Sequence, residues 1–135
     1  MKQHKTFKRN ILDINTPVGV GVSLPLNGPT VFNSTYSTKD QIKTNLLNLI
    51  LTEKGERINE PYFGLGLKKL IFEQSIEKEP LLESINNQLE LFLPEITIVD
   101  VIINNNQKEN TVNVNIIYSI DLTEINQNLQ VNFNY

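Results

Sequence analysis

The chain has 135 residues, 39% hydrophobic and 20% charged, with a formal net charge of −3. This length and composition fit one domain with its own hydrophobic core rather than two domains. The sequence has no cysteine, which excludes disulfides, thiolate nucleophiles and cysteine-ligated zinc. Its one histidine, His4, lies in a polar terminus, so a Ser/His/Asp triad and a histidine-based metal site are excluded elsewhere. We therefore expect no cofactor and no metal.

The first nine residues are basic, and we expect them to be a flexible, solvated tail on a single domain spanning 1–135. The positive side chains are Lys2, Lys5, Lys8 and Arg9. Contact with nucleic acid or an acidic partner is the alternative, but the whole chain is acidic and has no other basic stripe. No apolar run approaches the roughly 20 residues of a membrane span, and the N-terminal residues lack the apolar region of a signal peptide. We expect a protein made in a cytoplasm-like compartment that binds neither nucleic acid nor membrane.

The segment 18–36 is rich in glycine and proline and is expected to be extended. Val18, Val20 and Val22 alternate with small residues, which is typical of a short strand or an extended arm. The glycine and proline content disfavours a central strand of a sheet.

The first helix is predicted to begin at Ser37 or Thr38 and to be stopped by Gly55. Either residue can cap the helix, with Asp40 or Gln41 as the reciprocal member of a capping box. Gly55 suits the left-handed residue that ends a helix. Helical spacing predicts one buried apolar stripe, formed by Ile42, Leu46, Leu49 and Ile50.

A short apolar helix is predicted over 67–72, and a second long helix is predicted to begin at Pro80. Proline is favourable in the first helical turn because its missing N–H would have no partner there. Pro94 forbids continuation of this helix. Its core face is expected to contain Leu82, Ile85, Leu89 and Phe92.

The final third of the chain changes to β-structure. Residues 96–103 are dense in β-branched side chains, while 111–120 and 129–135 alternate apolar and polar positions. Helices followed by strands in a separate block indicate an α+β fold. We expect two main helices packed on a small antiparallel sheet that is formed mainly by the C-terminal third.

A charged loop between the helices invites an enzymatic reading. Two of Glu53, Glu56, Glu60 and Glu73 would be the acid and base of a glycosidase, which needs two carboxyls at a fixed separation. Basic residues interspersed among these acids favour ionised, paired carboxylates over a proton donor. The "GLG" at 64–66 resembles a phosphate loop only weakly, because no predicted strand precedes it.

Arg57 and its neighbours admit two interpretations. In a loop stiffened by glycine and proline, Arg57 beside Glu60 can lock the loop or meet a carboxylate of a partner. The sequence leaves these two roles open. Phe63 and the apolar residues that follow it are expected to be core or buried-interface groups.

The stretch "LLNLILTEKGERINEPYFGLGLKKLIFE" resembles the baseplate wedge proteins of contractile phage tails. These proteins are often labelled lysozyme-like, and they have a relative in the type VI secretion baseplate. The resemblance covers most of the chain, since the upstream segment is also similar to the tailed-phage branch. Its motif residues are Thr52, Gly55, Arg57, Pro61, Phe63, Gly64, Leu67, Ile71, Phe72 and Glu73.

The resemblance implies a structural protein of a virion tail baseplate, not an enzyme. It implies docking on the wedge core, initiation of the tail sheath through the C-terminal strand, contact with the tail tube, and several copies in a hexameric assembly. Many members dock through a Glu-Pro-Arg triplet, where this chain has Leu93, Pro94 and Glu95, so both charges differ. The partner-binding candidates are Arg57, Pro61, Phe63, Gly64, Pro94, Glu95, Leu129, Val131, Phe133 and Tyr135.

The last strand supports assembly without the family. An edge strand with polar Asn and Gln on one side can pair with another chain, although it can equally be an ordinary edge. We expect removal of residues 129–135 to leave the domain folded. The alternatives to the baseplate role are a peptidoglycan hydrolase acting through the glutamates and a soluble protein-binding adaptor of the same fold.

Overall fold

The computed structural model describes residues 19, 21–24, 34–73, 77–106, 108–121 and 123–134. Its elements in chain order are β1 (Gly21–Val22), β2 (Ser34–Thr35), α1 (Thr38–Leu51), α2 (Leu67–Glu73), α3 (Lys78–Phe92), β3 (Ile96–Asn106), β4 (Thr111–Ile120) and β5 (Thr123–Asn134). The basic tail expected at residues 1–9 lies outside the described residues, as do Val18, Val20 and Tyr135.

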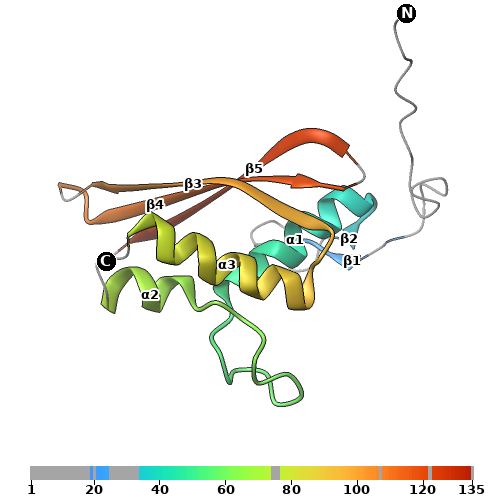
Figure 1. Cartoon of the computed structure of the whole chain (residues 1–135), viewed down its shortest axis with the longest axis horizontal. Helices are drawn as coiled ribbons and strands as arrows, with labels where there is room; N and C mark the ends of the chain where they lie inside the picture. The colour runs from blue at the N-terminus through green and yellow to red at the C-terminus, as the bar shows by residue number, and fades with distance from the viewer. Residues whose placement is uncertain are drawn as a thin grey trace, which may run out of the picture.

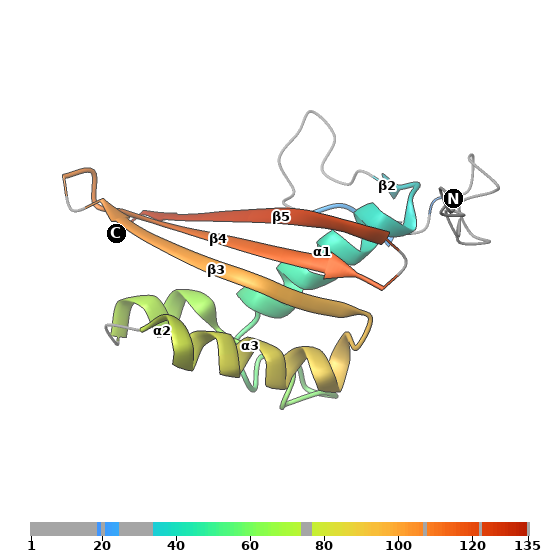
Figure 2. The same ribbon diagram turned by 45° about the horizontal axis from the view of Figure 1, so that its top comes forward.

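The described residues form two layers. One layer is the antiparallel sheet β3-β4-β5, and the other consists of α1, α2 and α3, which lie on one of its faces (Figure 1, Figure 2). β1 and β2 form a separate two-stranded ribbon next to α1. This arrangement confirms the predicted α+β fold, with helices packed on a sheet from the C-terminal third.

The start of α1 is capped by Ser37, whose Oγ accepts the backbone N–H of Lys39 at 3.2 Å. Gln41 does not complete a capping box. Its Oε1 accepts instead from the Thr35 hydroxyl at 2.6 Å, which ties α1 to β2. The predicted apolar stripe is confirmed, because its members are at most 6% exposed: Ile42, Leu46, Leu49 and Ile50.

Gly55 does not end α1, contrary to the prediction. The helix ends at Leu51, and Thr52 is its C-cap with an extended backbone at φ −68° and ψ 134°. The Asn48 carbonyl accepts both the Thr52 backbone N–H at 3.0 Å and the Thr52 hydroxyl at 2.7 Å, so the threonine side chain adds a second hydrogen bond at the helix end. Gly55 has a positive φ of 87°, which serves the turn that follows.

The helix α3 begins at Lys78, slightly before the predicted start, with Pro80 in its first turn. It ends at Phe92, and Pro94 follows the C-cap as predicted. Leu82 and Phe92 are only partly buried, because the face turned to the core is formed by Leu81, Ile85, Gln88 and Leu89. None of the described helices is long and apolar enough to cross a membrane.

The central strand of the sheet is β4, which pairs antiparallel with β3 on one side and with β5 on the other. Alternate residues of β4 point to the helices and are at most 3% exposed: Val112, Val114, Ile116, Tyr118 and Ile120. The apolar positions that alternate along β4 in the sequence are therefore the ones that face the core, and the positions between them face outward.

The end of β5 is part of the core, which overturns the expectation that residues 129–135 can be removed without loss of fold. Leu129, Val131 and Phe133 are 3%, 7% and 8% exposed and pair with Ile116, Val114 and Val112 of β4 respectively. Their removal would take three buried side chains out of the core and leave one edge of β4 without a partner among the described strands.

Candidate protein-binding site

The loop between α1 and α2 (residues 52–66) is fastened to the end of α1 by backbone hydrogen bonds. The Leu65 N–H donates to the Leu49 carbonyl at 2.9 Å, and the Gly66 N–H donates to the Thr52 carbonyl at 2.8 Å. Across the loop, the Gly55 N–H donates to the Pro61 carbonyl at 2.9 Å. These bonds give a loop without regular secondary structure a defined shape.

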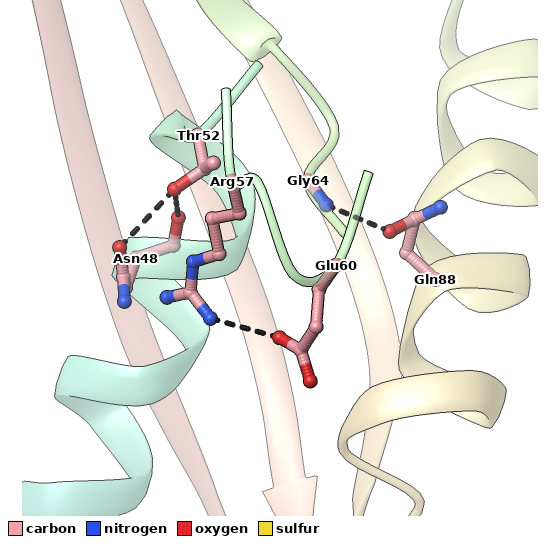
Figure 3. Close-up of polar contacts among 6 residues, drawn as sticks. All are labelled: Asn48, Thr52, Arg57, Glu60, Gly64 and Gln88. Atoms are coloured by element: carbon pink, nitrogen blue, oxygen red, sulfur yellow. Dashed lines mark hydrogen bonds and ion pairs between the residues drawn. The ribbon is translucent and has the colours of Figure 1, made fainter. Parts of the chain in front are cut away.

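Gly64 occupies a position that only glycine fits. Its φ is 111°, and a Cβ atom there would lie 2.4 Å from the Thr52 carbonyl oxygen. Its N–H donates to Oε1 of Gln88 at 3.1 Å (Figure 3). Nε2 of Gln88 donates to the Tyr62 carbonyl at 3.2 Å. Gln88 is 6% exposed, so this buried amide clamps the loop to α3.

Arg57 makes its described contacts within the chain. Its Nη1 pairs with Oε2 of Glu60 at 3.2 Å (Figure 3). Its guanidinium Cζ lies 3.7 Å from the centre of the Phe63 ring. Such a cation–π contact contributes about 0.5–1 kcal/mol at an exposed site. The ion pair contributes less, because both side chains are more than a third exposed. The structure therefore favours the loop-locking role of Arg57.

The Phe63 ring connects the loop to the end of α3. It is buried and meets the Phe92 ring edge-on, with 5.1 Å between ring centroids. Phe92 directly precedes the turn of Leu93, Pro94 and Glu95. The two segments that the sequence marked as partner-binding, the loop and this turn, therefore lie at the same end of α3.

Two exposed residues of the loop tip were missed by the sequence reasoning. Ile58 is 96% exposed and Tyr62 is 78% exposed, and Pro61 between them is exposed as well. The signal in the sequence was the position of these side chains inside a run of charged residues.

The other partner-binding candidates are distributed as follows. Pro94 is exposed and Glu95 is half-buried, and the Glu95 carbonyl accepts the Asp121 N–H at 3.1 Å. The side chains of Leu129, Val131 and Phe133 point into the core on β5. β5 is the sheet edge opposite β3, the strand against which α3 packs.

Two of the four carboxylates proposed for a glycosidase make contacts within the loop. Glu56 Oε2 accepts the Glu53 N–H at 3.0 Å, and Glu60 pairs with Arg57. Glu53, Glu56 and Glu60 are all exposed, and the side chain of Glu73 lies outside the described residues. This arrangement uses two of the acids to shape the loop.

A family model described as "Baseplate wedge protein gp25" matches residues 36–124, which is more than half of the chain. The chain belongs to this baseplate wedge family. The matched residues contain all three helices, the loop and the central strand of the sheet. Membership assigns the protein a structural role in a phage-like tail baseplate, as the resemblance implied.

Two solved structures are similar to the chain. A protein described as a tail lysozyme from Geobacter sulfurreducens has a TM-score of 0.60 and 23% identity, covering 73% of this chain and 91% of that chain. At this identity the likeness concerns the fold alone. A chain of the anti-feeding prophage (AFP) baseplate has a TM-score of 0.54 and 25% identity, covering 70% of this chain and 78% of that chain. No curated protein sequence matches the chain.

Proposed function

We propose that this protein is a non-enzymatic wedge subunit that docks on the core of a contractile tail baseplate and starts polymerisation of the tail sheath. The outer edge of β5 is the observation that carries the sheath-initiating role. Membership in the baseplate wedge family supports the location. The similar chain in a six-fold symmetrised AFP baseplate supports several copies per assembly.

β5 supplies an edge to which another strand can add. It pairs with β4 in continuous register from Gln127 to Asn134, and no described strand lies on its other side. An edge strand presents backbone N–H and C=O groups that a strand of another protein can pair with. Leu129, Val131 and Phe133 contribute by holding this edge on the core, while the backbone meets the sheath.

The outer face of the sheet next to this edge carries no charge. β4 has no charged residue, and neither does β5 after residue 124. The outward positions of β5 are occupied by Asn128, Gln130, Asn132 and Asn134. Burying amides that can hydrogen-bond costs less than burying charges, which suits a surface covered on assembly.

Lysines at this edge test the sheath-initiating role. Gln130 and Asn132 are exposed, so Gln130→Lys with Asn132→Lys should leave the fold intact. We expect baseplates to incorporate the variant while sheath growth from them falls by about tenfold or more, because lysines oppose strand addition at an edge. Electron microscopy of reconstituted baseplates with the cognate sheath protein measures this.

The matched control is Asn104→Lys, which lies in the same cross-strand row, Asn104–Asn113–Asn132, but on β3 at the opposite edge. Sheaths should grow normally on this variant. Normal sheath growth on the double-lysine variant at β5 would contradict the initiating role.

For docking on the wedge core, we propose the surface formed by the loop tip and the Leu93–Glu95 turn. The Phe63–Phe92 contact holds these two segments together. The loop tip presents Ile58, Pro61 and Tyr62 to solvent on a support that is fixed before binding, which lowers the entropy lost on association. The charges around Pro94 differ from the family's triplet, so apolar contacts at the tip carry more of this interface.

The double variant Ile58→Ser with Tyr62→Ser tests the docking surface. We expect its affinity for cognate wedge proteins to fall by about tenfold or more, as for loss of interface hot spots, with an unchanged urea unfolding midpoint. Co-sedimentation with reconstituted wedges measures the binding. Val22→Ser is the control, since Val22 is an exposed apolar residue of β1. Equal binding by the double variant and wild type would remove the loop tip from the interface.

A further inference from the structure

The two outer edges of the sheet differ at the place where their pairing with β4 shifts, because the shift in β3 is accompanied by an ion pair. β3 pairs with β4 on one side and with no described strand on the other. Its pairing shifts between Ile98 and Asp100, because Ile98 pairs with Tyr118 while Asp100 pairs with Ile117. Val99 is the additional residue of this bulge and is 52% exposed. A bulge at an edge bends the strand and interrupts the row of groups that a new strand would need.

The carboxylate of Asp100 occupies a backbone donor at this point. Its Oδ1 accepts the Val101 N–H at 2.8 Å and also contacts Nζ of Lys78 at 2.5 Å. The hydrogen bond from Lys78 and that from Val101 lower the pKa of Asp100, so the group is ionised at neutral pH. An N–H held by a carboxylate is not available to another strand, and the ion pair adds two charges that strand addition would have to displace.

The pair also joins the sheet to a helix. Lys78 lies in the first turn of α3, which packs against β3. Both side chains are partly exposed, at 46% and 38%, so the pair stands at the surface where an additional strand would arrive. At the opposite edge, the pairing of β5 with β4 also shifts, between Thr123 and Gln127 at the start of β5. From Gln127 to Asn134, however, β5 runs in continuous register and carries no charged residue.

We propose that Val99, Asp100 and Lys78 close the outer edge of β3 to strand addition, so that another protein's strand extends this sheet at β5 only. The claim that the β3 edge is closed depends only on the local geometry of these three residues. The claim that a strand of the sheath protein binds at β5 rests on the proposed function. A partner strand would therefore lie next to β5 and extend the order β3-β4-β5 on that side. No partner strand would add next to β3.

The structure suggests how to open the β3 edge. Deleting Val99 makes the pairs Ile98–Tyr118 and Asp100–Ile117 consecutive, which restores regular alternation in β3. Asp100→Thr and Lys78→Ala then remove the carboxylate and its partner while keeping a residue with high strand propensity. A control variant, Glu60→Ala, removes another exposed ion pair, Arg57–Glu60, without touching the sheet.

Sedimentation velocity of the full-length protein over a range of concentrations tests the proposal. We expect the opened variant to self-associate with an association constant raised by about tenfold or more over wild type, which is ~1.4 kcal/mol. The Glu60→Ala control should sediment as wild type does. The assay contains no sheath protein, so a negative result would contradict closure of the β3 edge but not sheath initiation at β5. A failure of sheath initiation in the reconstituted baseplates would likewise leave closure of the β3 edge intact.

Single nitroxide labels identify the edge that is used, since the chain has no cysteine of its own. Asn104→Cys marks β3 and Asn132→Cys marks β5, both exposed positions in the same cross-strand row. New dipolar coupling between β3 labels in the opened variant is the expected result. A folded opened variant that sediments like wild type, or that associates with coupling only between β5 labels, would overturn the proposal. If deletion of Val99 prevents folding, Lys78→Ala with Asp100→Thr carries the same test with the bulge retained.

Discussion

Replacement of Phe63 with alanine is expected to lower the free energy of unfolding by about 3–5 kcal/mol, the usual cost of truncating a buried aromatic residue. The Phe63 side chain is 7% exposed and meets both the Phe92 ring and the Arg57 guanidinium. Its loss leaves a cavity between the loop and α3 and removes the support of Arg57. Urea unfolding monitored by circular dichroism measures the change.

The adjacent aromatic residue provides the control. Tyr62 is 78% exposed, so Tyr62→Ala should change stability by about 0.5 kcal/mol or less. If Phe63→Ala and Tyr62→Ala had the same unfolding midpoint, Phe63 would not be the group that anchors the loop. A large effect of Phe63→Ala on baseplate incorporation would then need a direct contact with the partner.

Replacement of Gly64 with alanine is expected to destabilise the protein through the backbone. The φ of 111° costs a residue with a side chain about 1–3 kcal/mol. The new Cβ would lie 2.4 Å from the Thr52 carbonyl oxygen, and relieving such a contact adds about 1–3 kcal/mol. The movement would also weaken the bond from the Gly64 N–H to Gln88. Urea unfolding measures the sum.

Gly55→Ala separates the two contributions. Gly55 also has a positive φ, of 87°, but nothing lies within 4 Å of the Cβ position there. This variant should show the backbone strain without the steric contact, and therefore a smaller loss of stability. A Gly64→Ala variant as stable as Gly55→Ala would show that the loop can move away from Thr52 without cost.

The loop contains two groups of residues: those whose contacts within the chain hold its shape, and those whose side chains are exposed to solvent. Phe63, Gly64 and Arg57 belong to the motif, and their described contacts are intramolecular. Ile58 and Tyr62 lie between motif residues and are exposed. Substitutions in the first group should impair baseplate assembly through stability, whereas those in the second group should impair it at constant stability.

The elements themselves were determined by the sequence. The spacing of Ile42, Leu46, Leu49 and Ile50 predicted both α1 and its buried stripe, and the alternation from Val112 to Ile120 predicted both β4 and its core face. These predictions succeed because the period of a helix or strand places its residues on one face before any tertiary contact forms. The family motif likewise depends only on residue order.

The contacts between elements were decided by the tertiary structure. Periodicity placed Leu82 and Phe92 on the core face of α3, but packing against β3 and the loop rotated the helix toward Leu81 and buried Gln88. The partner of Gln88 is Gly64, far away in the sequence, so no local pattern predicts that bond.

Contacts between distant segments also explain what the sequence analysis missed at two glycines and at the two edges of the sheet. The sequence assigned helix termination to Gly55, whereas the close backbone approach that requires glycine occurs at Gly64, against the carbonyl of Thr52. The sequence recognised β5 as an edge, but it did not show that β3 is the other edge or that Lys78 meets Asp100 there. Side-chain period and residue order are properties of a short segment. The close approach of Gly64 to Thr52, the hydrogen bond from Gly64 to Gln88 and the Lys78–Asp100 ion pair exist only where separate segments of the folded chain meet.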